Sequence, residues 1–114
     1  MTKDENVSNP DHQVEIHTER EGDTYVVRLA GELDLAGCDL TEQALVTAEQ
    51  SDAASILVDI DGLEFIDSQG LRILLRAQRR DEDSGRKRLR LTRGTGHVAD
   101  LLRLTAMDQT LPFA

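Results

Sequence analysis

Alternation of apolar and polar residues predicts four β-strands along this chain. The strands are expected at residues 14–16, 25–29, 55–60 and 88–91. Turn-forming residues 21–23 lie between the first two strands and predict a hairpin. Residues 55–60 form a near-continuous apolar run, which is typical of a strand covered on both faces. We therefore expect Ile56, Leu57 and Val58 to be buried at the centre of a sheet.

Apolar residues spaced three and four positions apart predict three helices. Asp39 is placed to cap the first helix and Thr95 to cap the third, while the second follows Gly70. The expected inner faces are Leu40, Ala44, Leu45 and Ala48 in the first helix, Leu71, Leu74, Leu75 and Gln78 in the second, with Ile73 and Ala77 beside them, and Val98, Leu101, Leu102 and Thr105 in the third. The opposite side of the second helix is predicted to expose Arg72, Arg76, Arg79 and Arg80.

This order of strands and helices predicts a single α/β domain with a mixed sheet of four to five strands and helices packed on it. A chain of 114 residues is long enough to bury a core of its own. Residues 1–13 are polar and are predicted to be a disordered tail, so the domain is expected to span residues 14–114. The last five residues, TLPFA, can add a short edge strand, because Pro112 is incompatible with a central one.

The net charge of −9 is distributed unevenly. Nine of the thirteen basic residues lie between Arg72 and Arg93, where only three acidic residues oppose them. Such asymmetry suggests an oriented surface and a charged partner. The basic stretch has no aromatic residue on which a base could stack, and the whole chain is acidic, so we expect no direct nucleic-acid binding.

The sequence also bears on location and redox chemistry. No apolar run approaches the roughly 20 residues of a membrane span, and the first 13 residues contain no apolar segment of a signal peptide. Cys38 is the sole cysteine and cannot form an internal disulfide. These features predict a cytoplasmic protein without a membrane partner.

The most informative stretch is the turn Asp67-Ser68-Gln69-Gly70 between a predicted strand and the second helix. In α/β sheets, ligands and chemistry gather at the carboxyl ends of the strands. A helix N-terminus favours an anion, so a serine hydroxyl here is placed to hold a phosphate, and Gly70 is expected to leave the turn open to a partner. A second interpretation is that Asp67 or Ser68 simply caps the helix, and the two roles are compatible.

Three segments of the chain resemble the STAS domain, the sulphate-transporter and anti-sigma-factor-antagonist family. VDIDGLEFIDSQGLRILL is similar to the family's buried strand followed by Asp-Ser-x-Gly-Leu and a helix. GELDLAG at residues 31–37 is similar to the turn after the second strand, and LLRLTAMDQTLPF to the closing helix and final strand. Ala106 departs from the pattern, since a glycine is usual there. The resemblance covers about residues 14–113.

The resemblance implies a partner-switching regulator with no cofactor of its own. In the free-standing antagonists the serine after the aspartate is phosphorylated by an anti-sigma factor that is also a serine kinase, and this role transfers to Ser68. The partner contacts transfer to Asp67, Gln69, Gly70 and Asp34. A serine phosphatase would reset the switch. The alternative keeps the fold but makes the chain a STAS subunit of another assembly, such as a lipid-transport ATPase or a stress-sensing complex.

Two other classes of function have less support in the sequence. A hydrolase using Ser68 would need a base, but His12, His17 and His97 lie in no supporting motif and no Gly-x-Ser-x-Gly elbow is present. Cys38 and the histidines show no metal-ligand spacing. We therefore predict a binding module that is not an enzyme and holds no metal.

Overall fold

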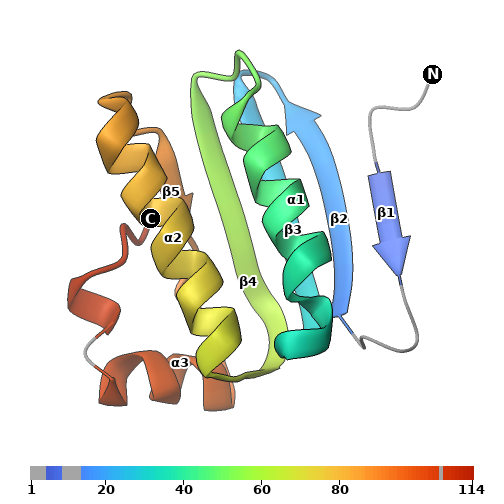
Figure 1. Cartoon of the computed structure of the whole chain (residues 1–114), viewed down its shortest axis with the longest axis vertical. Helices are drawn as coiled ribbons and strands as arrows, with labels where there is room; N and C mark the ends of the chain where they lie inside the picture. The colour runs from blue at the N-terminus through green and yellow to red at the C-terminus, as the bar shows by residue number, and fades with distance from the viewer. Residues whose placement is uncertain (1–4, 9–13, 106) are drawn as a thin grey trace.

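A mixed β-sheet carries helices on one face (Figure 1). The computed structural model describes residues 5–8, 14–105 and 107–114. In this part of the chain the five strands follow the order β1-β2-β3-β4-β5. The elements are β1 (Glu5–Ser8), β2 (Val14–Glu21), β3 (Thr24–Leu33), the 3₁₀ turn η1 (Leu35–Gly37), α1 (Cys38–Glu49), β4 (Ser55–Ile66), α2 (Ser68–Ser84), β5 (Leu89–Leu91), α3 (Gly96–Leu104) and the 3₁₀ turn η2 (Met107–Gln109). The predicted fold class is confirmed.

Strands β2 and β3 form the predicted antiparallel hairpin, and Gly22 supplies the positive φ that its tight turn requires. The prediction of a disordered tail over residues 1–13 differs from the structure at Glu5–Ser8. These four residues form β1, which pairs with residues 15–18 of β2. The free edge of β2 offers unpaired N–H and C=O groups, which explains why a polar segment can join it. The rest of the predicted tail lies outside the described residues.

Strand β4 runs parallel to β3 on one side and to β5 on the other. Parallel strands need crossover connections, and here α1 joins β3 to β4 and α2 joins β4 to β5. As a result, β3 and β4 end at the same edge of the sheet, and α1 and α2 begin there (Figure 1). This edge contains the turn that the sequence marks.

The core lies between the sheet and the two helices α1 and α2. Along β4, Ile56, Val58 and Ile60 are buried and alternate with less buried residues. Leu57 is only half-buried, so the prediction of a strand buried on both faces is wrong for this residue. The reason is that α1 and α2 pack on one face, which requires a period-2 burial pattern.

The predicted helices are present, with changes at their ends. Helix α1 begins at Cys38 after the cap residue Gly37, so Asp39 lies in the first turn and does not cap it as predicted. In α3, Thr95 occupies the N-cap position as expected, but its hydroxyl donates to Asp61 O and makes no capping hydrogen bond. The helix ends at Leu104, and Thr105 is exposed. The most buried residues of α2 are Gly70, Ile73, Leu74 and Ala77, while Leu71, Leu75 and Gln78 are half-buried.

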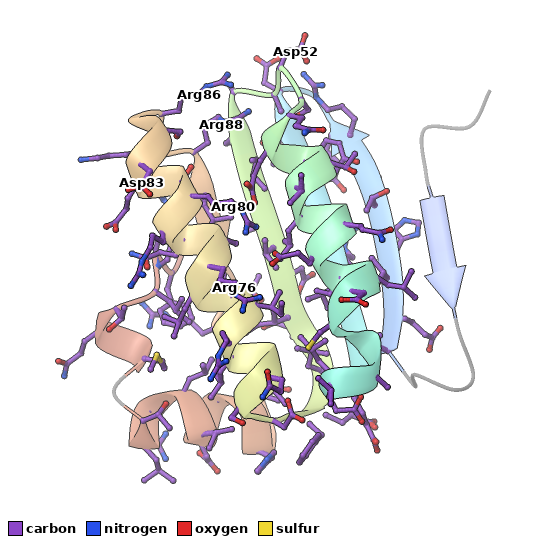
Figure 2. All side chains as sticks on the ribbon, viewed as in Figure 1. Asp52, Arg76, Arg80, Asp83, Arg86 and Arg88 are labelled. Atoms are coloured by element: carbon purple, nitrogen blue, oxygen red, sulfur yellow. The ribbon has the colours of Figure 1, made fainter. Side chains whose placement is uncertain are left out.

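One arginine of the basic stretch is buried instead of solvated. Arg88 is 8% exposed, and its guanidinium donates hydrogen bonds to the backbone oxygens of Glu49, Ser51 and Ala53. Glu49 is the last residue of α1, and Ser51 and Ala53 lie in the loop that follows it. Figure 2 places Arg88 and Arg86 at this end of the molecule. The backbone N–H of Arg88 in turn bonds to Asp81. Arg88 therefore joins the start of β5 to the end of α1.

The C-terminal segment adds one point of pairing to the sheet. The predicted edge strand over residues 110–114 is reduced to a parallel bridge between Phe113 and Leu91 of β5. Leu111 is buried beside it, and the Arg93 guanidinium lies 5.2 Å from the centre of the Phe113 ring. Among the described residues, no helix is long and apolar enough to cross a membrane.

A candidate regulatory site at the start of helix α2

The site is formed where β3 and β4 end side by side. Asp34 follows β3 and Asp67 follows β4, and the backbone N–H of Asp67 donates to Leu33 O at 3.2 Å. Ser68 is the first residue of α2 and is exposed, whereas Gln69 is half-buried. The turn thus presents one hydroxyl to solvent from a backbone that is hydrogen-bonded to the neighbouring strand.

Asp67 caps α2 and fixes the geometry of the turn. Its Oδ1 accepts hydrogen bonds from the backbone N–H groups of Gln69 and Gly70, both at 2.9 Å. Its own backbone is extended, as an N-cap residue requires. The capping interpretation is confirmed for Asp67, and it leaves the hydroxyl of Ser68 outside the cap.

Gly70 has a packing role rather than the open position that the sequence suggests. It is buried, and a Cβ at this position would lie 2.7 Å from Ile66 Cγ1, 2.9 Å from Leu33 O and 3.0 Å from Leu33 Cγ. Only glycine allows α2 to approach the ends of β3 and β4 this closely. The expectation that Gly70 leaves the turn open is therefore wrong, because the residue packs against the core, while its contact with a partner stays a prediction.

Asp34 forms the part of the site that follows β3. Its side chain accepts from the backbone N–H of Ala36 at 3.1 Å and caps the turn η1, and its backbone oxygen accepts from the thiol of Cys38 at 3.2 Å. Burial raises the pKa of Cys38, and the charges of Asp67 and Asp34 raise it further. Both carboxylates therefore lie near this thiol, so the structure brings the predicted residues Asp34 and Asp67 to one edge.

The sequence and this arrangement agree with one protein family. A sequence model of the family described as "Mlab, STAS domain" matches residues 16–112, which is most of the chain. The chain belongs to the STAS domain family. The resemblance inferred from the turn and the closing segment is thereby confirmed.

Solved structures share the fold of this STAS domain. An anti-sigma factor antagonist from Mycobacterium paratuberculosis superposes with a TM-score of 0.78 at 24% identity, covering 94% of this chain and 89% of that one. The anti-sigma factor antagonist SpoIIAA in its unphosphorylated form gives a TM-score of 0.68 at 24% identity, covering 87% of each chain. No curated protein sequence matches the chain. At these identities the likeness establishes the fold.

Two exposed apolar residues lie next to the predicted site residues of the STAS domain, and sequence reasoning missed them. Leu35 follows Asp34 and is 69% exposed, while Phe65 precedes the turn and is 40% exposed. The Phe65 ring stacks on His97 at the start of α3, with ring centres 5.6 Å apart and planes 6° from parallel. Leu35 comes after Asp34, beyond the last strand residue Leu33, where the sheet no longer offers a buried position to an apolar side chain, and this signal could have revealed it.

Two grooves of the domain lie away from this turn. One, of about 150 Å³, lies beside α1 and is lined by Ile16, Thr18, Tyr25, Leu40, Gln43, Ala44 and Thr47. Another, of about 190 Å³, lies beside α3 and is lined by Arg93, Ala99, Leu102, Arg103 and Phe113. Neither includes Asp34 or residues 67–70. Across the described residues, no cluster of three or more His, Cys, Asp or Glu side chains is arranged to hold a metal ion.

Proposed function

We propose that this STAS domain is an anti-sigma factor antagonist that is switched by phosphorylation of Ser68. The observation that carries the proposal is the position of Ser68, which is exposed as the first residue of α2 on a turn fixed by the Asp67 cap. The anti-sigma factor antagonists with the same fold support the role at the level of fold. Unphosphorylated, the chain binds an anti-sigma factor that is also a serine kinase, and so releases a sigma factor.

The partner surface is built from the edge around Ser68. Asp34 and Asp67 supply negative charge, and Leu35 and Phe65 supply exposed apolar area. An apolar centre with a charged rim is the usual composition of a protein–protein interface. A partner that fits has an apolar pocket for Leu35. Gln69 lies next to this surface, whereas Gly70 supports it from within.

The chemical step is a phosphoryl transfer to which the domain contributes only the hydroxyl. The Ser68 oxygen attacks the γ-phosphorus of ATP bound by the kinase, ADP leaves, and the hydroxyl proton passes to a base of the kinase. The product carries about −1.5 to −2 additional charges beside Asp67. At a docked interface these charges must be desolvated, and a loss of about 3 kcal/mol would weaken binding more than a hundredfold. A serine phosphatase restores the first state.

Affinity capture from the native cell tests the proposal, with mass spectrometry of the partners and of Ser68. The captured kinase is then incubated with the domain and ATP, the phosphate is mapped, and affinities before and after are compared by calorimetry. Ser68→Ala should bind the kinase and escape modification, whereas Ser68→Asp should fold normally and bind weakly. A phosphate on another residue, or equal binding by the phosphorylated form, would contradict the proposal.

The same capture decides between this function and the alternative. As a STAS subunit of a lipid-transport ATPase or a stress-sensing complex, the domain would be recovered with that assembly and without a sigma-factor regulator. The likeness to anti-sigma factor antagonists over about nine tenths of both chains supports the first function at the level of fold, which the alternative shares.

A further inference from the structure

The arginines of α2 differ in whether they already have a counter-charge. Arg80 bonds to Glu49 of α1 at 2.7 Å and to Glu42 at 3.0 Å, and Arg76 lies 3.7 Å from Glu42. Figure 2 shows both side chains on the side of α2 that faces α1. Arg72 is exposed, and no carboxylate of the described residues forms an ion pair with it.

The start of α2 has few backbone donors left for a phosphate. A helix begins with four N–H groups that lack a partner within the helix, here those of residues 67–70. The N–H groups of Gln69 and Gly70 are bonded to Asp67 Oδ1, and that of Leu71 is bonded to Asp67 O. The N–H of Asp67 is bonded to Leu33 O, so at most the N–H of Ser68 is left for an anion attached to Ser68, and a full counter-charge has to come from a side chain.

Arg72 lies four residues after Ser68, on the same face of the helix. Residues at this spacing have Cβ atoms about 5–6 Å apart, and an acidic group four residues before a basic one is the favourable orientation. Both side chains are exposed and can meet without displacing a core residue. We propose that Arg72 is the counter-charge of the phosphate on Ser68 within the same chain. This inference rests on the proposed phosphorylation of Ser68.

The pair gives phosphorylation a second effect on the surface. In the unmodified chain the guanidinium of Arg72 is available to a partner that docks at the start of α2. In the modified chain it is held by the phosphate, so the edge gains negative charge and loses a cation in one step. The partner then meets a changed charge pattern while the helix itself gains a stabilising pair.

A titration of the phosphate measures the pair directly. Phosphoserine is installed at position 68 during synthesis, so that no kinase is needed, and its second ionisation is followed by phosphorus NMR. Arg72 favours the dianion and should lower this pKa. We expect Arg72→Gln to raise it by about 0.3 of a pH unit, which corresponds to an ion pair on a helix surface. High salt should remove the difference.

Arg79→Gln is the matched control. Arg79 is exposed on the same face of α2, but eleven residues beyond Ser68, or roughly 16 Å along the helix axis. At physiological salt that separation exceeds the screening length of about 8 Å, so Arg79→Gln should leave the titration unchanged. Arg72→Lys should retain most of the effect, because it keeps the charge. If Arg72→Gln titrates like the wild type, or Arg79→Gln shifts it equally, the inference is wrong.

The two proposals can fail separately. A native kinase that modifies Ser68, together with an unshifted titration in Arg72→Gln, would reject the role of Arg72 and leave the proposed function intact. A shifted titration in a protein that no native kinase modifies would reject the proposed function, while the pairing chemistry of Arg72 would stand.

Discussion

Replacing Arg88 by methionine tests whether a buried cation organises the end of the sheet that lies opposite Ser68. The methionine keeps much of the apolar stem but removes three hydrogen bonds, at 2.5 Å to Glu49 O, 3.0 Å to Ser51 O and 2.8 Å to Ala53 O. The carbonyl groups would then lie at the edge of the core without a donor. The side chain is 8% exposed, so water reaches the vacated position poorly.

The expected loss of stability follows from these contacts. A hydrogen bond to a charged group contributes about 1.5–3 kcal/mol, and an unsatisfied buried acceptor costs about 1–3 kcal/mol. Three such bonds would give a larger sum, but removing the guanidinium also removes its desolvation penalty, and its Nε has no partner in the described structure. We expect a net loss of about 3 kcal/mol, which is a large part of the 5–15 kcal/mol typical of a domain.

Urea unfolding followed by circular dichroism measures this loss as a lower midpoint at unchanged slope. Arg86→Met is the control, because Arg86 is exposed two residues earlier and should change stability by less than about 0.5 kcal/mol. Arg88→Lys should fall between the two, since an ammonium group cannot reach three oxygens in the planar geometry of a guanidinium. A loss below about 1 kcal/mol for Arg88→Met would refute the assigned role.

Four further predictions concern the site and the core. Gly70→Ala should destabilise by about 1–2 kcal/mol in urea unfolding, because overpacking against Leu33 and Ile66 outweighs the helix propensity of alanine; a more stable variant would contradict this packing. Asp67→Ala should cost about 1 kcal/mol through the lost cap, with faster amide exchange at Gln69 and Gly70 as the specific sign. Leu74→Ala should cost roughly 2–5 kcal/mol, whereas the exposed Leu104→Ala should be nearly neutral. Cys38 should react with a thiol reagent more slowly in the folded than in the unfolded chain, because its raised pKa and burial reduce accessible thiolate; equal rates would contradict the buried position.

The parts of the fold that depend on local sequence were predictable. The hairpin follows from alternation around a turn, and the start of α2 follows from Asp67 at a capping position. Strand β4 was predicted over residues 55–60, but it continues to Ile66. Its second half pairs with β3 through register shifts, and Gly62 packs close to Ala30 there. In the sequence, the pair Asp61-Gly62 suggests that the strand ends there, and only the pairing with β3 shows that it continues.

The features that could not be predicted depend on contacts between distant residues. The bonds of Arg88 reach 35 to 39 residues along the chain, so its sequence neighbours, which include exposed basic residues, suggest a solvated position. Gly70 lies in a turn motif that suggests an open position, and only the approach of Leu33 shows the close packing. Asp39 has the residue type of a cap, but Asp34 and η1 lead the chain into α1 two residues earlier.

The rigidity of the turn bears on how a modification at Ser68 could act. Asp67 holds two N–H groups, its own N–H is bonded to β3, and Gly70 is fitted against the core, so the turn has little freedom to change shape. A phosphate on the exposed hydroxyl breaks none of these contacts. Any change in partner binding must then arise from the altered charge of the surface and its cost of desolvation, rather than from refolding of the domain. A partner that distinguishes the two forms therefore has to contact the start of α2 itself.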